Sequence, residues 1–203
     1  TQFNAFVPEE GDDAYVLPLK LHQIESAFIP VNTPVEDGQI MDILGEEMQF
    51  FTKYGSDDKV HTTVWMPKRK ILLTTLLWSG PPNLYTLRGD VFRDPSNWIE
   101  GLKFNRSLEA EVLITAIGKP VIGKQNVEDT LNGYIDGTSF VLDQTIRGIN
   151  NGQGPDELRH TVVMPEYLKE TPQNNESYGE VSSYPPAIFH HAVGWYDNDA
   201  ASL

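Results

Sequence analysis

Apolar and polar positions in the first half of the chain follow the patterns of short β-strands. Two runs, 40–44 and 47–51, flank a two-residue turn at Gly45-Glu46, which predicts a β-hairpin. Positions 60–66 alternate between apolar and polar residues, as in a strand with polar flanks. The mostly apolar run 71–77 predicts a strand buried on both faces. These segments are expected to form a layered core that consists mainly of sheet.

A helix and a further buried strand are predicted downstream. Asp94 suits the N-cap of a helix, Pro95 suits its first helical position, and apolar residues at 98, 99 and 102 provide one buried face. Residues 111–117 then return to the pattern of a buried strand. The succession of strand, helix and strand indicates an α/β unit.

The second half of the chain has the pattern of helices. Apolar residues recur at roughly helical spacing from Glu128 to Ile149. Asn150-Asn151-Gly152 is a helix stop, and Pro155, followed at once by two acidic residues, restarts a short helix. A linker over 171–175 and a terminal helix that begins near Pro185-Pro186 complete this half.

The change of pattern at Gly123 predicts a domain boundary. Residues 1–122 are assigned to an α/β portion and residues 123–203 to an all-α region. At 203 residues the chain is long enough for one substantial core, or for a medium domain with a smaller appendage.

Composition narrows the classes of function. The net charge of −14 disfavours binding to nucleic acid and to anionic lipid. The absence of Cys excludes disulfides, thiolate nucleophiles and Cys-based zinc sites, and leaves the compartment open. No apolar run approaches the roughly 20 residues of a membrane span. Because the chain starts at Thr1 with neither an initiator Met nor a signal segment, we expect a fragment of a larger protein.

Five short motifs of the helical half occur in the same order in one known family. They are the runs 143–147 (Asp-Gln-Thr-Ile-Arg), 150–152, 155–158 (Pro-Asp-Glu-Leu), 178–179 and 194–197 (Gly-Trp-Tyr-Asp). Together they resemble the helical dimerisation region of alkylsulfatases of the metallo-β-lactamase superfamily. The segment 83–89, with Arg93-Asp94 after it, is similar to the Asn-x-x-Thr-Leu-Arg-Gly segment of that family. The resemblance extends from about Gly38 to the end of the chain.

The resemblance implies a fold, a partner and a substrate class. The fold would be part of a metallo-β-lactamase-like αββα sandwich of class α/β, followed by an all-α region that forms a homodimer. In the family a two-zinc centre activates water, and Asn83, Tyr85 and Arg88 would bind a small anionic ester of sulfate. A guanidinium and an amide are suitable donors to an oxyanion. The alternative is that Arg88 pairs with Asp90 or Asp94, and that Asn83 caps the turn after Pro82.

The chain departs from the family at its metal ligands. None of its five His forms the H-x-H-x-D-H segment of the family, which fits a fragment that begins inside the catalytic domain. Thr75 stands where the family has a metal-bridging Glu, and Ile117-Gly118 stand where it has a ligand His. Those positions cannot hold zinc, because none of these three residues has a side chain that serves as a zinc ligand.

Asp57 and His61 are the remaining candidates for a metal site. Asp57 lies near the position of a third metal carboxylate of the family, and His61 lies at the start of the strand beside it. The alternative is a polar loop with a strand-edge His that bonds a neighbouring backbone group. His190 and His191 point about 100° apart on a helix, so we expect one of them in the core and the other at the surface or an interface.

Two hypotheses of function follow. The first is a metal-dependent hydrolase that resembles alkylsulfatases and hydrolyses an anionic, sulfate-type ester, with most metal ligands outside this chain. The second is a non-catalytic homologue whose helical region serves as a dimerisation or interaction module, because Thr75 and Ile117-Gly118 replace metal ligands. A third possibility is another ester class on the same scaffold.

Overall fold

The computed structural model describes residues 29–55, 61–77, 80–84, 92–177 and 179–194. The chain divides into two compact units, Thr1–Pro34 and Val35–Leu203. The first unit contributes only residues 29–34 to the described part, and these contain neither helix nor strand.

A six-stranded sheet forms the first part of the second unit. Its strands are β1 (Ile40–Ile43), β2 (Glu46–Phe51), β3 (Thr63–Met66), β4 (Ile71–Thr74), β5 (Val112–Thr115) and β6 (Val121–Ile122), in that spatial order. Every pair is antiparallel except β4 and β5, which run parallel with Thr74 opposite Thr115. Helix α1 (Pro95–Ser107) connects this parallel pair, so the predicted α/β unit is confirmed.

The β-hairpin is confirmed, with its turn one residue earlier than predicted. Ile43 pairs with Glu46, so Leu44 and Gly45 form the turn, both with positive φ. Two successive residues with positive φ are typical of the type I′ turn, whose twist matches that of the strands. Leu rarely adopts a positive φ, so the sequence does not indicate a turn that begins at Leu44.

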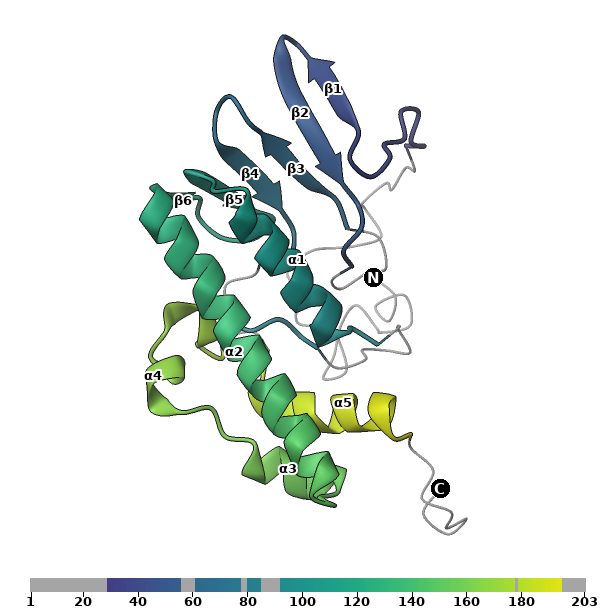
Figure 1. Cartoon of the computed structure of the whole chain (residues 1–203), viewed down its shortest axis with the longest axis vertical. Helices are drawn as coiled ribbons and strands as arrows, with labels where there is room; N and C mark the ends of the chain where they lie inside the picture. Colours follow the sequence, from purple (N-terminus) through teal and green to yellow (C-terminus); the bar gives the residue numbers. More distant parts are fainter. Residues whose placement is uncertain (1–28, 56–60, 78–79, 85–91, 178, 195–203) are drawn as a thin grey trace, which may run out of the picture. The chain divides into compact units, whose positions relative to one another are not determined.

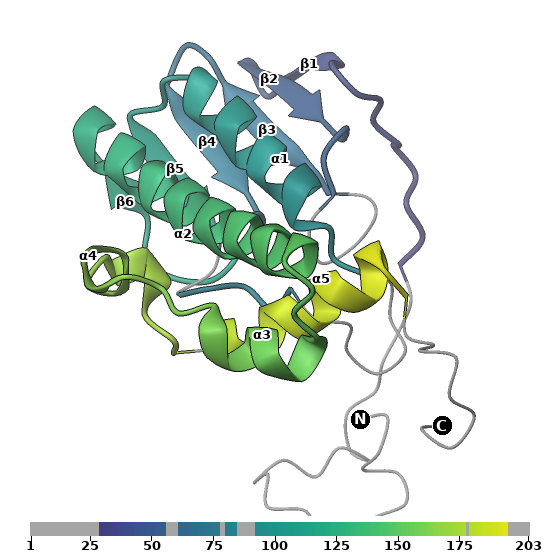
Figure 2. The ribbon, with the colours of Figure 1, turned by 60° about the horizontal axis from the view of Figure 1, so that its bottom comes forward.

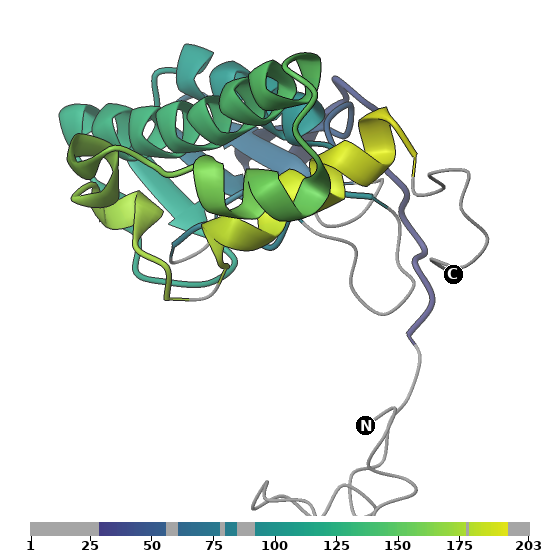
Figure 3. The same ribbon diagram turned by 90° about the horizontal axis from the view of Figure 1, so that it is seen from below.

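Helices α1 and α2 (Lys124–Asn150) lie side by side across one face of the sheet (Figures 2 and 3). This arrangement corrects the prediction that residues 71–77 are buried on both faces. Leu72 and Thr74 are buried, whereas Ile71 and Leu73 are only half-buried, because the described helices cover a single face.

The long helix of the second half ends, and the next helix begins, where the sequence predicts. Helix α2 starts at Lys124, ends at Asn150 and is followed by Gly152 with positive φ, and α3 (Pro155–Thr161) starts at the predicted proline. The remaining elements are α4 (Glu166–Lys169), η3 (Pro172–Asn174), η4 (Val181–Ser183) and α5 (Tyr184–Ala192). In Figure 1 these elements gather along α2, away from β1 and β2.

One buried apolar cluster joins the sheet and the helical half. Trp98 and Leu102 of α1 belong to the same cluster as Leu131 of α2 and Ile188 of α5. Helix α2 contacts α1, β5 and β6 as well as α3 and α5. The division at Gly123 therefore stays a prediction.

None of the helices in the described ranges is long and apolar enough to cross a membrane.

Candidate functional site

A buried imidazole lies at the carboxyl end of β4. The His61 side chain is only 4% exposed, and its Nε2 lies 3.2 Å from Thr63 Oγ1 and 3.1 Å from Thr74 Oγ1. Its Nδ1 contacts the hydroxyl of Thr75. Asn105 of α1 donates from Nδ2 to Thr74 Oγ1 over 3.2 Å, which holds the group from the helix side. Residues from β3, β4 and α1 thus fix the orientation of His61.

This network brings together two residues that the sequence singles out separately. His61 is a predicted metal ligand, and Thr75 stands where the resemblance places a metal-bridging Glu. Among the described residues, hydroxyl groups contact both ring nitrogens of His61, and neutral hydroxyls are not the ligands that zinc prefers. Within the described ranges, no three His, Cys, Asp or Glu side chains come together. The described residues therefore do not form a zinc site.

Asp57 lies outside the described residues, so its predicted pairing with His61 on a metal stays a prediction. The same holds for Tyr85 and Arg88 as substrate-binding residues. Asn83 is described: its side chain is 6% exposed, and its backbone oxygen accepts from Arg93 Nη1 at 2.8 Å. Asn83 Oδ1 has no hydrogen-bond partner in the described part of the chain, so this atom does not cap the turn after Pro82.

Residues 80–82, which lead from β4 to Asn83, are held by the helical half. Tyr134 Oη of α2 accepts from the Gly80 amide at 3.4 Å, and the Gly179 amide donates to the Pro81 oxygen at 3.0 Å. Tyr184 of α5 donates to the Pro82 oxygen. We call residues 80–82 the clamped segment. The two tyrosines were missed in the sequence analysis, because no local pattern pairs residues 54 and 102 positions apart.

The backbone of the clamped segment lies so close to later parts of the chain that only glycine fits at two of the contact positions, Gly80 and Gly179. A Cβ on Gly80, which has φ of +112°, would collide with the Asn175 oxygen. A Cβ on Gly179 would collide with the Pro81 oxygen and would lie 2.7 Å from the Pro82 oxygen. The helical half therefore fixes this backbone by direct contact between main chains.

A pocket of about 350 Å³ opens beyond the carboxyl ends of β4 and β5. Its lining includes Leu77, Gly80, Thr115, Gly118, Lys119 and Tyr134. We call it the β4–β5 pocket. The edge at which parallel strands end is a frequent location of binding sites in α/β folds. Ile117-Gly118, where the resemblance places a ligand His, line this pocket, whereas Asn83 and His61 do not.

Burial raises the pKa of Tyr134, while the hydrogen bond from the Gly80 amide opposes this shift. The phenol of Tyr134 therefore stays protonated at neutral pH. As a neutral hydroxyl it both accepts from Gly80 and keeps a hydrogen to donate.

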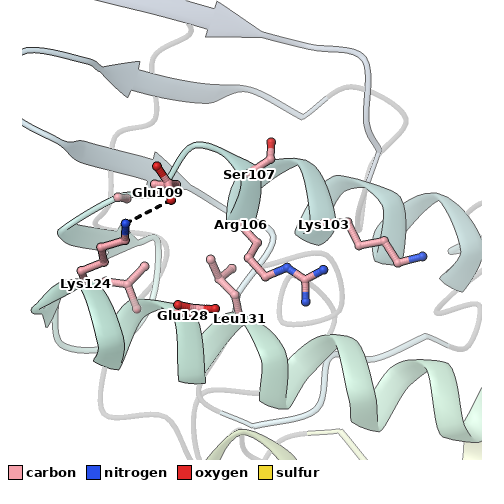
Figure 4. Close-up of a pocket in the computed structure, with 9 residues that line it drawn as sticks. Lys103, Arg106, Ser107, Glu109, Lys124, Glu128 and Leu131 are labelled. Carbon is pink, nitrogen blue, oxygen red and sulfur yellow. Dashed lines mark hydrogen bonds and ion pairs between the residues drawn. The ribbon is translucent and has the colours of Figure 1, made fainter.

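A second pocket of about 340 Å³ lies between α1 and α2 (Figure 4). Its basic side chains already have partners: Lys124 pairs with Glu109 at 3.0 Å, and Arg106 donates to Asn132 Oδ1 at 2.6 Å. The Lys124 ammonium also lowers the pKa of Glu109. Because Lys124 is paired with a carboxylate and the lining also contains Glu128, this pocket is a weaker candidate for an anionic ligand.

The prediction that one of His190 and His191 faces the core is wrong. Both side chains are exposed, and the His191 ring stacks on Phe92 with the centroids 4.0 Å apart. The two histidines belong to the last turn of α5, which extends past the end of α3 (Figure 2). Both rings therefore lie at the surface of the described part of the chain.

The chain is similar in sequence to alkylsulfatases. Residues 154–203 match the alkyl sulfatase dimerisation family. A linear primary-alkylsulfatase from Pseudomonas sp. (strain ATCC 19151) is 33% identical over 185 residues, which are 90% of this chain and 35% of that protein. The resemblance to the alkylsulfatases is confirmed. An alkyl/aryl-sulfatase from Saccharomyces cerevisiae is 28% identical over 86% of this chain and 27% of that protein.

Solved structures place this alkylsulfatase-like chain in a known fold. The stereoselective inverting sec-alkylsulfatase from Pseudomonas sp. superposes with a TM-score of 0.76 and 24% identity, over 85% of this chain and 28% of that chain. A metallo-β-lactamase family protein from Thermus thermophilus gives a TM-score of 0.51 at 14% identity, over 78% of this chain and 48% of that one. The predicted fold class is confirmed.

The chain spans only about a third or less of the length of the alkylsulfatases that it resembles. The dimerisation match covers α3 to the end of the chain, and the sheet and α1 lie before it. The activity and assembly of the full-length relatives are therefore only proposals for this chain.

Proposed function

We propose that this chain is part of a hydrolase for sulfate esters, in which the segment after β4 binds the anionic group. The single observation that carries the proposal is the clamped segment. Three hydrogen bonds from α2, Gly179 and α5 fix residues 80–82, directly before Asn83. A backbone segment fixed in this way is suited to position donors for an ester, because misplaced donors lose most of their effect.

The proposed role of Asn83 is to orient the ester, with Arg88 as its charged partner. A guanidinium offers paired donors to the sulfate oxygens, and an amide adds a neutral donor beside it. Zinc, which the resemblance implies, would have to be held by residues outside the described part of the chain.

The full-length gene product is expected to release inorganic sulfate from decyl sulfate, measured by ion chromatography. Asn83→Ala is expected to lower the rate about 10-fold or more, because a hydrogen bond to a charged group is lost. Asn97→Ala is the matched control, since Asn97 is exposed on α1. The proposal would be overturned if the full-length protein, with metal bound, released no sulfate.

The network around His61 favours a second candidate, a non-catalytic homologue. Thr63, Thr74 and Thr75 supply hydroxyls to His61, and Thr75 stands at the position where the resemblance implies a carboxylate ligand. On this hypothesis the gene product carries no stoichiometric zinc in elemental analysis and releases no sulfate. Zinc bound at one or more equivalents per chain would exclude it.

We also propose that two copies associate through the helical half. Four large apolar side chains of that half are exposed among the described residues: Ile146 (39%), Val163 (57%), Tyr167 (70%) and Val193 (59%). Three of them, Val163, Tyr167 and Val193, lie within residues 154–203, which match the alkyl sulfatase dimerisation family.

Light scattering after size exclusion is expected to give the mass of a dimer. Tyr167→Lys should shift the mass toward that of a monomer at micromolar concentration, because it places a charge in the apolar contact. Leu44→Lys is the control, since Leu44 is fully exposed in the β1–β2 turn. If Tyr167→Lys leaves the mass at that of a dimer while Leu44→Lys lowers it, the helical half is not the interface.

A further inference from the structure

We infer that the β4–β5 pocket is a binding site for a small tetrahedral oxyanion such as sulfate, with Lys119 as its charge and Tyr134 as its buried donor. This site is separate from the one proposed at Asn83, because Asn83 does not line the pocket. Its volume of about 350 Å³ is in the range of small-molecule sites, roughly 300–1,000 Å³.

The charge of the lining is the first argument. The chain has 29 acidic and 15 basic residues, yet the described residues that line this pocket include Lys119 and no Asp or Glu. Among the described residues, no carboxylate forms an ion pair with Lys119. In the pocket of Figure 4, by contrast, Lys124 is paired with Glu109. An uncompensated ammonium in an otherwise neutral lining favours an anionic ligand.

The hydroxyl of Tyr134 is the second and independent argument. Tyr134 is 6% exposed, its oxygen accepts from the Gly80 amide, and no described residue accepts its hydrogen. A buried donor without an acceptor is unfavourable, so a ligand oxygen in the pocket would satisfy it. Thr130, which also lines the pocket, has a hydroxyl of the same kind. Its Oγ1 accepts from Gln173 Nε2 at 3.4 Å, and no described residue accepts its hydrogen.

The backbone beside Lys119 leaves space for a ligand. Gly118 has φ of +118°, a conformation that side chains rarely adopt, and a Cβ there would meet only Thr115 Oγ1 at 3.6 Å. The Thr115 hydroxyl donates to the Ile117 oxygen at 2.7 Å and stabilises this turn. The turn presents Lys119 next to the position where the resemblance places a ligand His. Lys119 thus directly follows the residue pair that stands in place of the implied ligand His.

Sodium sulfate is the probe, titrated calorimetrically into the full-length gene product at ionic strength held constant with sodium chloride. We expect saturable binding of sulfate, which Lys119→Met weakens about 10-fold or more. Tyr134→Phe should weaken it several-fold. Lys68→Met is the matched control, because Lys68 is an exposed lysine in the β3–β4 turn and lies outside the pocket.

Lys119→Met changes an exposed side chain, so its folding can be verified by an unchanged melting temperature. Sulfate binding that Lys119→Met leaves intact would overturn the inference, as would an absence of binding beyond that of chloride. Failure of the proposed hydrolase function can be distinguished from failure of this inference. In the first case decyl sulfate is not hydrolysed, while the protein still binds sulfate. Conversely, hydrolysis without a Lys119-dependent sulfate site would overturn only the present inference.

Discussion

Trp98→Ala is expected to lower the free energy of unfolding by about 3–5 kcal/mol, the range for truncating a buried aromatic residue. Trp98 is 1% exposed in the core between α1 and the sheet. Its Nε1 donates to the Leu76 oxygen at 2.7 Å, directly after Thr75. The variant therefore loses packing and leaves a buried carbonyl without its donor. Urea denaturation followed by circular dichroism measures the loss.

Trp98→Phe is the matched variant, because it keeps an aromatic ring and removes the indole donor. Its cost is expected to be smaller than that of Trp98→Ala by at least about 1 kcal/mol, since less volume is removed. If Trp98→Ala cost less than about 1 kcal/mol, α1 would not be anchored on the sheet as described. Equal costs for both variants would assign the effect to the hydrogen bond to Leu76.

Gly179→Ala is expected to cost about 1–3 kcal/mol and to loosen the clamped segment. The added Cβ would collide with the Pro81 oxygen, and backbone atoms cannot move aside as a flexible side chain can. The hydrogen bond from the Gly179 amide to Pro81 would be strained at the same time. Urea denaturation gives the cost, and faster amide exchange at Gly80 would report the loosening.

Gly154→Ala is the control for this variant, because a Cβ at Gly154 meets no atom within 4 Å and the residue has no positive φ. Its effect on stability should stay below about 1 kcal/mol, the cost of replacing the N-cap of α3 by the less favoured Ala. If Gly179→Ala were as mild as Gly154→Ala, the direct contact between the backbones of Pro81 and Gly179 would not hold in solution.

Local signals account for the parts of the fold that the sequence predicted well. Asp94 accepts from the Ser96 amide at 2.9 Å, as an N-cap does, and α3 starts at Pro155. These features depend on residues within a few positions of each other. The hairpin turn was misplaced by one residue because Leu44 adopts a positive φ that its side chain disfavours.

The candidate site depends on contacts that local patterns do not encode. Tyr184 reaches Pro82 across 102 positions, and Asn105 reaches Thr74 across 31. His61 was recognised as a chemically capable residue, but its three hydroxyl neighbours follow from the pairing of β3 with β4. The family resemblance supplied Asn83 and the position of Thr75, whereas Lys119 and Tyr134 required the structure.

Helix α2 carries glycines at positions 133, 137 and 148, each in close contact with a later segment. A Cβ at these positions would collide with Gln173, Asn174 and Leu158, respectively. Each glycine costs the helix about 1 kcal/mol relative to alanine, so α2 is poorly stable without the segments that fill these spaces. The second half of α2 and residues 155–174 should therefore unfold as one cooperative unit, with a common opening free energy in hydrogen exchange.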